Sequence, residues 1–154
     1  NDIDYLYIAD TYGSMNPEKV KYIFSNLVDL KQKNLKLGFH IHNNGQIGMA
    51  NMIASLDYVN IIDASYSGMG RGAGNVRLED VILYLKIKES YNFNIEPFLN
   101  YFDNKSNRDE IKNTLLGLLN IHPYRIRDYD NENKLYDLYK HLLNLSFEKK
   151  YDYK

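Results

Sequence analysis

Short β-like runs alternate with amphipathic helical stretches through about the first 90 residues, and this alternation limits the fold more than any other feature. Such a pattern predicts βα units and a parallel sheet covered by helices. Three units fit, at about 30 residues each, which is close to the roughly 250 residues that a (β/α)8 barrel spends on eight units. A chain of 154 residues therefore has room for half of such a barrel and not for a whole one.

The three βα units can be placed along the chain. Strands are expected at residues 5–11, 35–42 and 60–65. Asn16 and Pro17 are typical of a helix start, and the apolar stripe of that helix comprises Val20, Ile23, Phe24, Leu27 and Val28. A second helix is expected at residues 46–56, with Ile47, Ala50, Ile53 and Ala54 on one side. A third is expected after a cap at Asn75, with an inner face of Leu78, Val81, Ile82 and Leu85.

The pattern changes after Tyr91. Residues 92–102 are expected to hold a further strand and a turn, although Pro97 is unusual inside a strand. Two more helices are then marked by apolar spacing, one by Ile111, Leu115, Leu118 and Leu119, the other by Leu135, Leu138, Tyr139, Leu142 and Leu143. The fold class predicted is α/β, the C-terminal half of a barrel (about strands 5 to 8) with extra C-terminal helices. The predicted domains are residues 1–102 and 103–154, with a frayed end at 148–154.

Composition excludes several kinds of chemistry. The chain has no cysteine, which removes disulfides, thiolate zinc sites and iron–sulfur clusters. Its formal net charge of -1 gives no overall attraction to nucleic acid or to an anionic membrane. No apolar run reaches the roughly 18 residues that a membrane helix needs. We therefore expect a soluble, cytoplasmic protein that binds neither nucleic acid nor membrane.

The strongest chemical signal is the run GFHIHNN at residues 38–44. Side chains two apart in a strand share a face, so His40 and His42 can converge on one ion. The opposite parity is apolar throughout and suits packing under helices: Leu35, Leu37, Phe39 and Ile41. Two strand-end histidines can also simply hydrogen-bond to nearby loops, but the neighbouring Asn43 and Asn44 favour a ligand pair. Nitrogen and oxygen donors without sulfur suit Mn²⁺, Mg²⁺ or Zn²⁺.

Two loops add weaker signals. The glycine-rich run at residues 68–75 joins a strand to a helix, where an anion can sit, and its Asn75 can be a helix cap, a metal ligand or both. The run ADTYGSM at residues 9–15 offers hydroxyl and amide groups to a carboxylate, although turn chemistry alone also selects Asp, Gly and Ser. Of the other histidines, His141 is expected at the surface and His122 in a loop.

Three motifs occur together and in order: ADTYGSM, GFHIHNN with ANMIAS after it, and SGMGRGAGN followed by LED. Over residues 4–89 they resemble the C-terminal half of the pyruvate-using, metal-dependent aldolases of the 4-hydroxy-2-oxovalerate aldolase type. The wider group includes hydroxymethylglutaryl-CoA lyase and isopropylmalate synthase. The resemblance implies a (β/α)8 barrel enzyme that makes or breaks a carbon–carbon bond in a 2-oxo acid through a metal-bound pyruvate enolate.

Site residues also follow from the resemblance. His40, His42 and Asn75 match the positions of ligands to a divalent metal, with Mn²⁺ or Mg²⁺ preferred over Zn²⁺, and Thr11 matches a hydroxyl that holds the substrate carboxylate. Arg71 receives no role. The Arg-Asp pair that the family carries at the end of its first strand is not in this chain, and the general base stays unknown. The chain is therefore expected to be a fragment that is inactive alone.

Other interpretations stay open. A barrel metallohydrolase also carries an HxH pair on a strand, but its further ligands would have to be His122 and His141. A non-catalytic half-barrel could instead act as an assembly module through its open sheet edges. Expected partners are a small 2-oxo acid, a second copy of the chain or an N-terminal half-barrel, and an aldehyde dehydrogenase.

Overall fold

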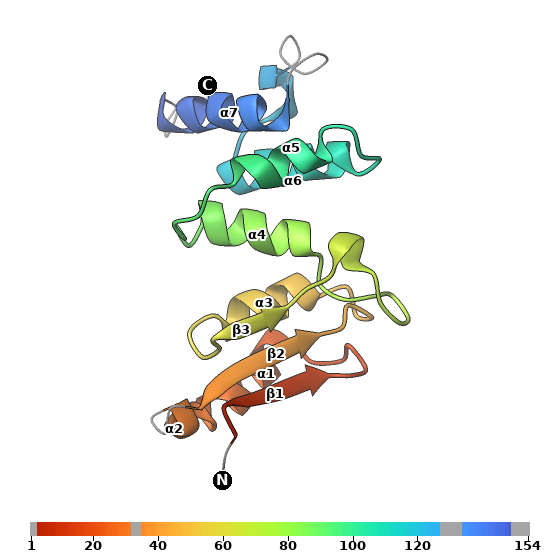
Figure 1. Ribbon diagram of the computed structural model, residues 1–154, viewed down its shortest axis with the longest axis vertical. Helices are drawn as coiled ribbons and strands as arrows, with labels where there is room; N and C mark the ends of the chain where they lie inside the picture. Colours follow the sequence, from red (N-terminus) through yellow and green to blue (C-terminus); the bar gives the residue numbers. More distant parts are fainter. Residues whose placement is uncertain (1–2, 32–34, 127–133, 149–154) are drawn as a thin grey trace. The chain divides into compact units, whose positions relative to one another are not determined.

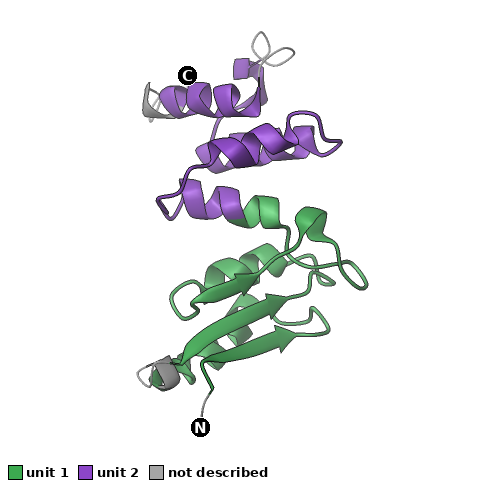
Figure 2. Cartoon of the chain, viewed as in Figure 1, with its two compact units in different colours: residues 1–81 green, residues 82–154 purple. Residues whose placement is uncertain are grey.

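The computed structural model describes residues 3–31, 35–126 and 134–148, which belong to two compact units divided between residues 81 and 82 (Figure 2). The first unit contains a parallel sheet in the order β1-β2-β3, formed by β1 (Tyr5–Asp10), β2 (Lys36–Ile41) and β3 (Ile61–Asp63). These strands confirm the parallel α/β sheet that the alternating pattern predicts. Each predicted strand extends slightly beyond the observed one.

Helix α1 (Pro17–Ser25) begins as the sequence predicts. The Asn16 side chain accepts a hydrogen bond from the Lys19 N–H at 2.8 Å, and Pro17 occupies the first turn. Val20 and Phe24 are fully buried, and the Phe24 ring meets the Phe39 ring of β2 edge-on with 5.1 Å between centroids. The apolar stripe therefore packs this helix against the sheet (Figure 1).

The end of α1 corrects the expected apolar stripe. The helix ends at Ser25, where the Asn26 side chain donates to the Tyr22 carbonyl at 2.6 Å and the Leu27 N–H turns to the Phe24 carbonyl at 3.0 Å. Val28 opens a separate short helix, α2 (Val28–Lys31), and is 41% exposed. Its assignment to the buried stripe of the first helix is wrong.

Helix α3 (Gly48–Ser55) buries a different face from the one predicted. Ile47, Ala50 and Ile53 are exposed, and the buried residues are Gly48, Asn51, Met52, Ala54 and Ser55. Asn51 can be buried because its side chain donates to the Met15 carbonyl at 2.8 Å, and Ser55 donates to the Met52 carbonyl at 2.7 Å. The small side chains on this face allow close packing beside α1.

The two faces of β2 follow the predicted parity. Leu37, Phe39 and Ile41 are fully buried on the helix-covered side of the sheet. Residues of the other parity lie beside their partners on the neighbouring strands, with Tyr7 next to Gly38 and Asp63 next to His40. The face away from α1 and α3 therefore carries the histidine of the strand.

Helix α4 (Leu78–Ile87) starts later than expected. The N–H groups of Val76 and Leu78 bond to Ile41 and Ser65 carbonyls, and Arg77 pairs with Ser65 in a parallel bridge. These contacts keep residues 75–77 extended, so Asn75 is not the cap of this helix. Of the expected inner face, Val81 is buried, whereas Leu78, Ile82 and Leu85 are only partly buried; Glu79 and Leu83 are fully buried.

The second unit is helical: α5 (Glu96–Phe102), α6 (Arg108–Leu119), the 3-10 turn η2 (Pro123–Ile126) and α7 (Leu135–Glu148). The fourth strand expected at residues 92–102 is wrong, because Pro97 lies in the first turn of α5, where its missing N–H is harmless, and the Asn94 Oδ1 accepts from the Glu96 N–H at 3.0 Å in the turn before the helix. The predicted α6 and α7 are confirmed, with buried residues Ile111, Leu115, Leu135, Leu138 and Leu142.

The domain boundary expected at residue 102 stays a prediction, and residues 149–154 of the expected frayed end lie outside the described residues. No helix in the described ranges is long and apolar enough to cross a membrane.

Candidate functional site

His40 and His42 lie at the carboxyl end of β2. Their ring centroids are 5.1 Å apart and the ring planes meet at 74°. Both residues are partly exposed. The two imidazoles are therefore adjacent and accessible from solvent, as ligands to one ion need to be.

Asn75 is brought to this pair by backbone pairing. His42 and Asn75 form an isolated antiparallel bridge, flanked by hydrogen bonds from Asn43 N–H to the Gly74 carbonyl at 2.8 Å and from Val76 N–H to Ile41 at 3.0 Å. The three candidate ligands thus meet at one end of the sheet. Their role as ligands stays a prediction.

The nitrogen and the oxygen of the Asn75 side-chain amide have different hydrogen bonding. Its Nδ2 donates to the Met69 carbonyl at 3.0 Å. Its Oδ1 is buried and has no hydrogen-bond partner among the described residues. A buried acceptor without a partner is costly, but the Asn51 Oδ1 is in the same state, so it is the pairing of Asn75 with His42 that makes this oxygen a candidate ligand.

A carboxylate that the sequence analysis did not single out stands beside His40. Asp63 ends β3, and its Oδ2 lies 3.2 Å from Nδ1 of His40. The only local signal was an acidic residue after two isoleucines at a strand end. Recognising it required the strand register that places Asp63 next to His40.

Asn44 connects the loops that surround the site. Its Nδ2 donates to the Tyr12 carbonyl at 3.1 Å, and its Oδ1 accepts from the Ala73 N–H at 2.8 Å. Gly72 has φ +63°, and a Cβ there would lie 2.6 Å from Asn44 Oδ1. The loops after β1 and β3 are therefore both fixed to the loop after β2.

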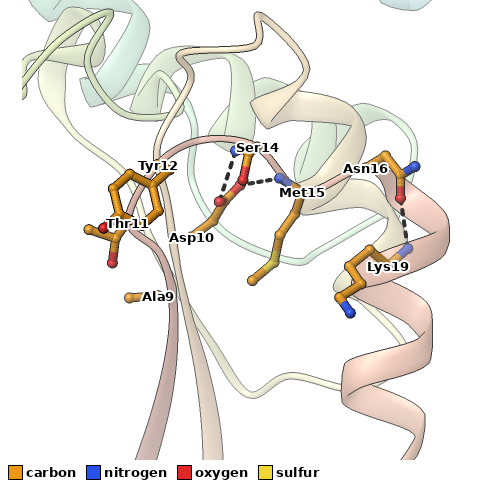
Figure 3. Close-up of a pocket in the computed structure, with 8 residues that line it drawn as sticks. All are labelled: Ala9, Asp10, Thr11, Tyr12, Ser14, Met15, Asn16 and Lys19. Atoms are coloured by element: carbon orange, nitrogen blue, oxygen red, sulfur yellow. Dashed lines mark hydrogen bonds between the residues drawn. The ribbon is translucent and has the colours of Figure 1, made fainter.

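Thr11 directly follows β1, whose last residue Asp10 pairs with Ile41 next to His42, and it lines an open cavity of about 520 Å³ (Figure 3). The cavity is lined by Ala9, Asp10, Thr11, Tyr12, Ser14, Met15, Asn16 and Lys19. Thr11 is exposed, and Lys19 brings a positive charge to the same cavity. A hydroxyl and an ammonium group are therefore available to an anion there.

Asp10 lines this cavity but is engaged by its own turn. It is 2% exposed, and its carboxylate accepts from the N–H groups of Ser14 at 3.0 Å and Met15 at 3.1 Å. The aspartate of the ADTYGSM motif therefore shapes the loop that carries Thr11.

The remaining histidines belong to the second unit. His122 precedes η2, is exposed and stacks on Tyr124 with 4.9 Å between ring centroids. His141 lies on α7 and is partly buried.

The fold and site define an α/β protein with a parallel sheet and a polar cluster at the carboxyl ends of its strands. A family model described as HMGL-like matches residues 2–107, which is more than half of the chain. The chain belongs to the HMGL-like family.

Relatives with curated names are aldolases. The chain is 43% identical over 75 residues to 4-hydroxy-2-oxovalerate aldolase 3 of Burkholderia lata, covering 48% of this chain and 22% of that protein. It is 44% identical over 75 residues to 4-hydroxy-2-oxovalerate aldolase 5 of Dechloromonas aromatica, covering 48% of this chain and 21% of that protein. The matched part thus spans about a fifth of the length of these relatives.

Two solved structures are similar. The Bacillus subtilis HMG-CoA lyase matches with a TM-score of 0.50 and 27% identity, over 55% of this chain and 30% of that one. The N-terminal domain of a Bacteroides vulgatus protein matches with a TM-score of 0.51 and 26% identity, over 95% of this chain and 46% of that one. Both agree with the family assignment.

Proposed function

We propose that the chain is part of a divalent-metal-dependent aldolase or lyase that makes or breaks a carbon–carbon bond in a 2-oxo acid. The observation that carries the proposal is the adjacent ring pair of His40 and His42, to which the backbone bridge of His42 joins Asn75, whose Oδ1 is unpartnered among the described residues. The names of the aldolase relatives and the HMGL-like family support the reaction class. A small 2-oxo acid is the proposed substrate, and an aldehyde dehydrogenase partner stays a prediction.

The donor set fits a divalent cation. Two imidazole nitrogens and one amide oxygen would hold it, and Mn²⁺ or Mg²⁺ is the proposed metal. Such an ion supplies Lewis acidity, which stabilises negative charge that develops on a substrate oxygen. The protein's own part is to orient the imidazoles on β2 and to hold the Asn75 amide by its bond to the Met69 carbonyl.

Thr11 is the proposed carboxylate-binding residue. Its hydroxyl can donate to an anionic oxygen, and the charge of Lys19 on the same cavity favours an anion. Asn44 fixes the neighbouring Tyr12 backbone relative to the glycine-rich loop. This connection would set the spacing between the carboxylate site and the metal site.

We also propose that β1, β2 and β3 are consecutive strands from the C-terminal half of a (β/α)8 barrel. The face that carries Tyr7, Gly38 and His40 would then be the barrel interior, and the site would lie at the carboxyl ends of the strands, as in other barrel enzymes. The chain would be a fragment of the active protein, and alone it should release little or no pyruvate from 4-hydroxy-2-oxo acids in the presence of Mn²⁺. Turnover comparable to that of an intact aldolase would contradict the fragment proposal.

Metal content tests the ligand assignment. Elemental analysis of the purified chain after incubation with Mn²⁺ should show bound metal that is lost in the His40→Ala, His42→Ala double variant. His122→Ala is the matched control, because its imidazole is exposed and outside the site. Equal metal in the wild-type chain and the double variant would refute the assignment.

A further inference from the structure

Asp63 and His40 form a carboxylate–imidazole pair across two strands. Strand pairing places the two residues side by side, and Asp63 Oδ2 lies 3.2 Å from His40 Nδ1. The side chain of Asp63 is 43% exposed and that of His40 is 35% exposed. The pair is therefore set by the register of β2 and β3, and solvent or an ion can reach it.

The contact determines which nitrogen of His40 is free. A neutral imidazole carries one N–H, and the other nitrogen holds a lone pair. When Nδ1–H donates to Asp63, the lone pair lies on Nε2, which is then the nitrogen that can bind a metal. Metal-binding histidines commonly donate their second N–H to a carboxylate in this way, and the partner raises their basicity.

The Asp63 carboxylate also adds negative charge near the proposed metal site. The proposed ligands, two imidazoles and one amide, would all be neutral, so they would leave the charge of a bound divalent ion uncompensated. Within the described ranges, no three His, Asp or Glu side chains are placed to hold one ion together. Asp63 contacts His40 at Nδ1, so its negative charge would act on an ion bound at Nε2 through the imidazole ring.

We propose that Asp63 is a positioning residue that holds His40 in its Nδ1–H tautomer and presents Nε2 to the divalent ion. This inference rests on the proposed function, because it takes His40 as a metal ligand. It adds a residue that neither the sequence motifs nor the matched family description assigns.

Two measurements on the full chain test the role. Calorimetric titration with Mn²⁺ should give a dissociation constant about 10- to 100-fold higher for Asp63→Asn than for the wild-type chain. Asp57→Asn is the matched control, because Asp57 is exposed on the loop before β3, and it should bind like wild type. Nitrogen-15 NMR of the metal-free protein in alkaline buffer should show His40 protonated on Nδ1 and a shift toward the Nε2–H tautomer in Asp63→Asn.

The outcomes separate this inference from the proposed function. Unchanged affinity and an unchanged tautomer in Asp63→Asn would overturn the positioning role alone. A loss as large as that of His42→Ala would also overturn it, because Asp63 would then be a direct ligand. If the wild-type chain bound no Mn²⁺, or if His42→Ala bound it equally well, the proposed function would fail, and the positioning role would fail with it.

Discussion

His42 and Asn75 pair backbone to backbone in an isolated antiparallel bridge, although α3, β3, a 3-10 turn at Tyr66–Gly68 and the glycine-rich loop separate them along the chain. The bridge places the Asn75 amide beside the histidine pair without using its side chain. The Nδ2 of that side chain donates to the Met69 carbonyl, so its Oδ1 is the atom left for another role, and the backbone bridge should keep the loop in place when the side chain is removed.

Asn75→Ala should weaken Mn²⁺ binding about 10-fold or more and lower the free energy of unfolding by only about 1 kcal/mol, for the lost bond from Nδ2 to the Met69 carbonyl. The affinity falls because the buried Oδ1 is lost as a ligand, whereas the loop keeps the backbone bonds of Asn43 and Val76. Isothermal titration and thermal unfolding measure the two effects. Asn113→Ala, on the exposed side of α6, is the control for the same change. Unaltered metal affinity in Asn75→Ala would exclude Asn75 as a ligand.

Asn44→Ala should lower the free energy of unfolding by about 1–2 kcal/mol, because it removes one donated and one accepted hydrogen bond between loops. Asn44→Asp should cost less, since it keeps an acceptor for the Ala73 N–H and loses only the donor to Tyr12. Urea unfolding would rank the three proteins. Identical stabilities would show that Asn44 does not hold the loops.

Gly38→Ala should destabilise the sheet, because a Cβ would lie 2.5 to 2.7 Å from three ring atoms of Tyr7. Overpacking of this kind typically costs about 1–3 kcal/mol. In a Tyr7→Ala background the same change should cost under about 0.5 kcal/mol, because the obstructing ring is gone. A double-mutant cycle in urea measures the coupling. An equal cost in both backgrounds would show that Tyr7 does not pack over Gly38.

The parts of this fold that can be predicted from the sequence are those with local causes. The helix start at Asn16 and Pro17 depends on neighbouring residues, and the two faces of β2 follow from strict alternation. The spacing of His40 and His42 on one strand likewise predicts that their side chains lie together. Their meeting with Asn75 came from the family resemblance, since nothing local links the two loops.

Of three differences between the predicted and observed structure, two have tertiary causes and one has a local cause. The face of α3 was misassigned because burial of Asn51 depends on a partner at Met15, which periodicity does not reveal. Asp63 was missed because its significance comes from strand register. The fourth strand was wrong because Pro97 and Asn94 favour a helix start over an edge strand. The burial of Asn51 and the position of Asp63 each depend on a residue distant in sequence, whereas the fourth strand required a choice between two local signals.

The chain expressed alone should self-associate. Among the described strands, β1 and β3 each have a strand neighbour on one side only, so backbone donors and acceptors on their other sides are available for pairing. The sheet face away from α1 and α3 also exposes Tyr5 by 50% and Tyr7 by 43%. A second copy or an N-terminal half-barrel could cover these groups. Sedimentation velocity at micromolar concentration should therefore show species larger than 18.1 kDa.

A charge on the β1 edge should reduce this association. Tyr5→Glu adds a carboxylate that can pair with its cross-strand neighbour Lys36, so the sheet itself should tolerate it, while a second strand would have to bury the charge. Tyr22→Glu is the matched control, because Tyr22 is also an exposed tyrosine beside a lysine but lies on α1. The Tyr5 variant should shift toward monomer and the Tyr22 variant should not. A compact, cooperatively unfolding monomer of the wild-type chain would contradict the open half-barrel, because its edges and inner face would then have to be closed within one copy.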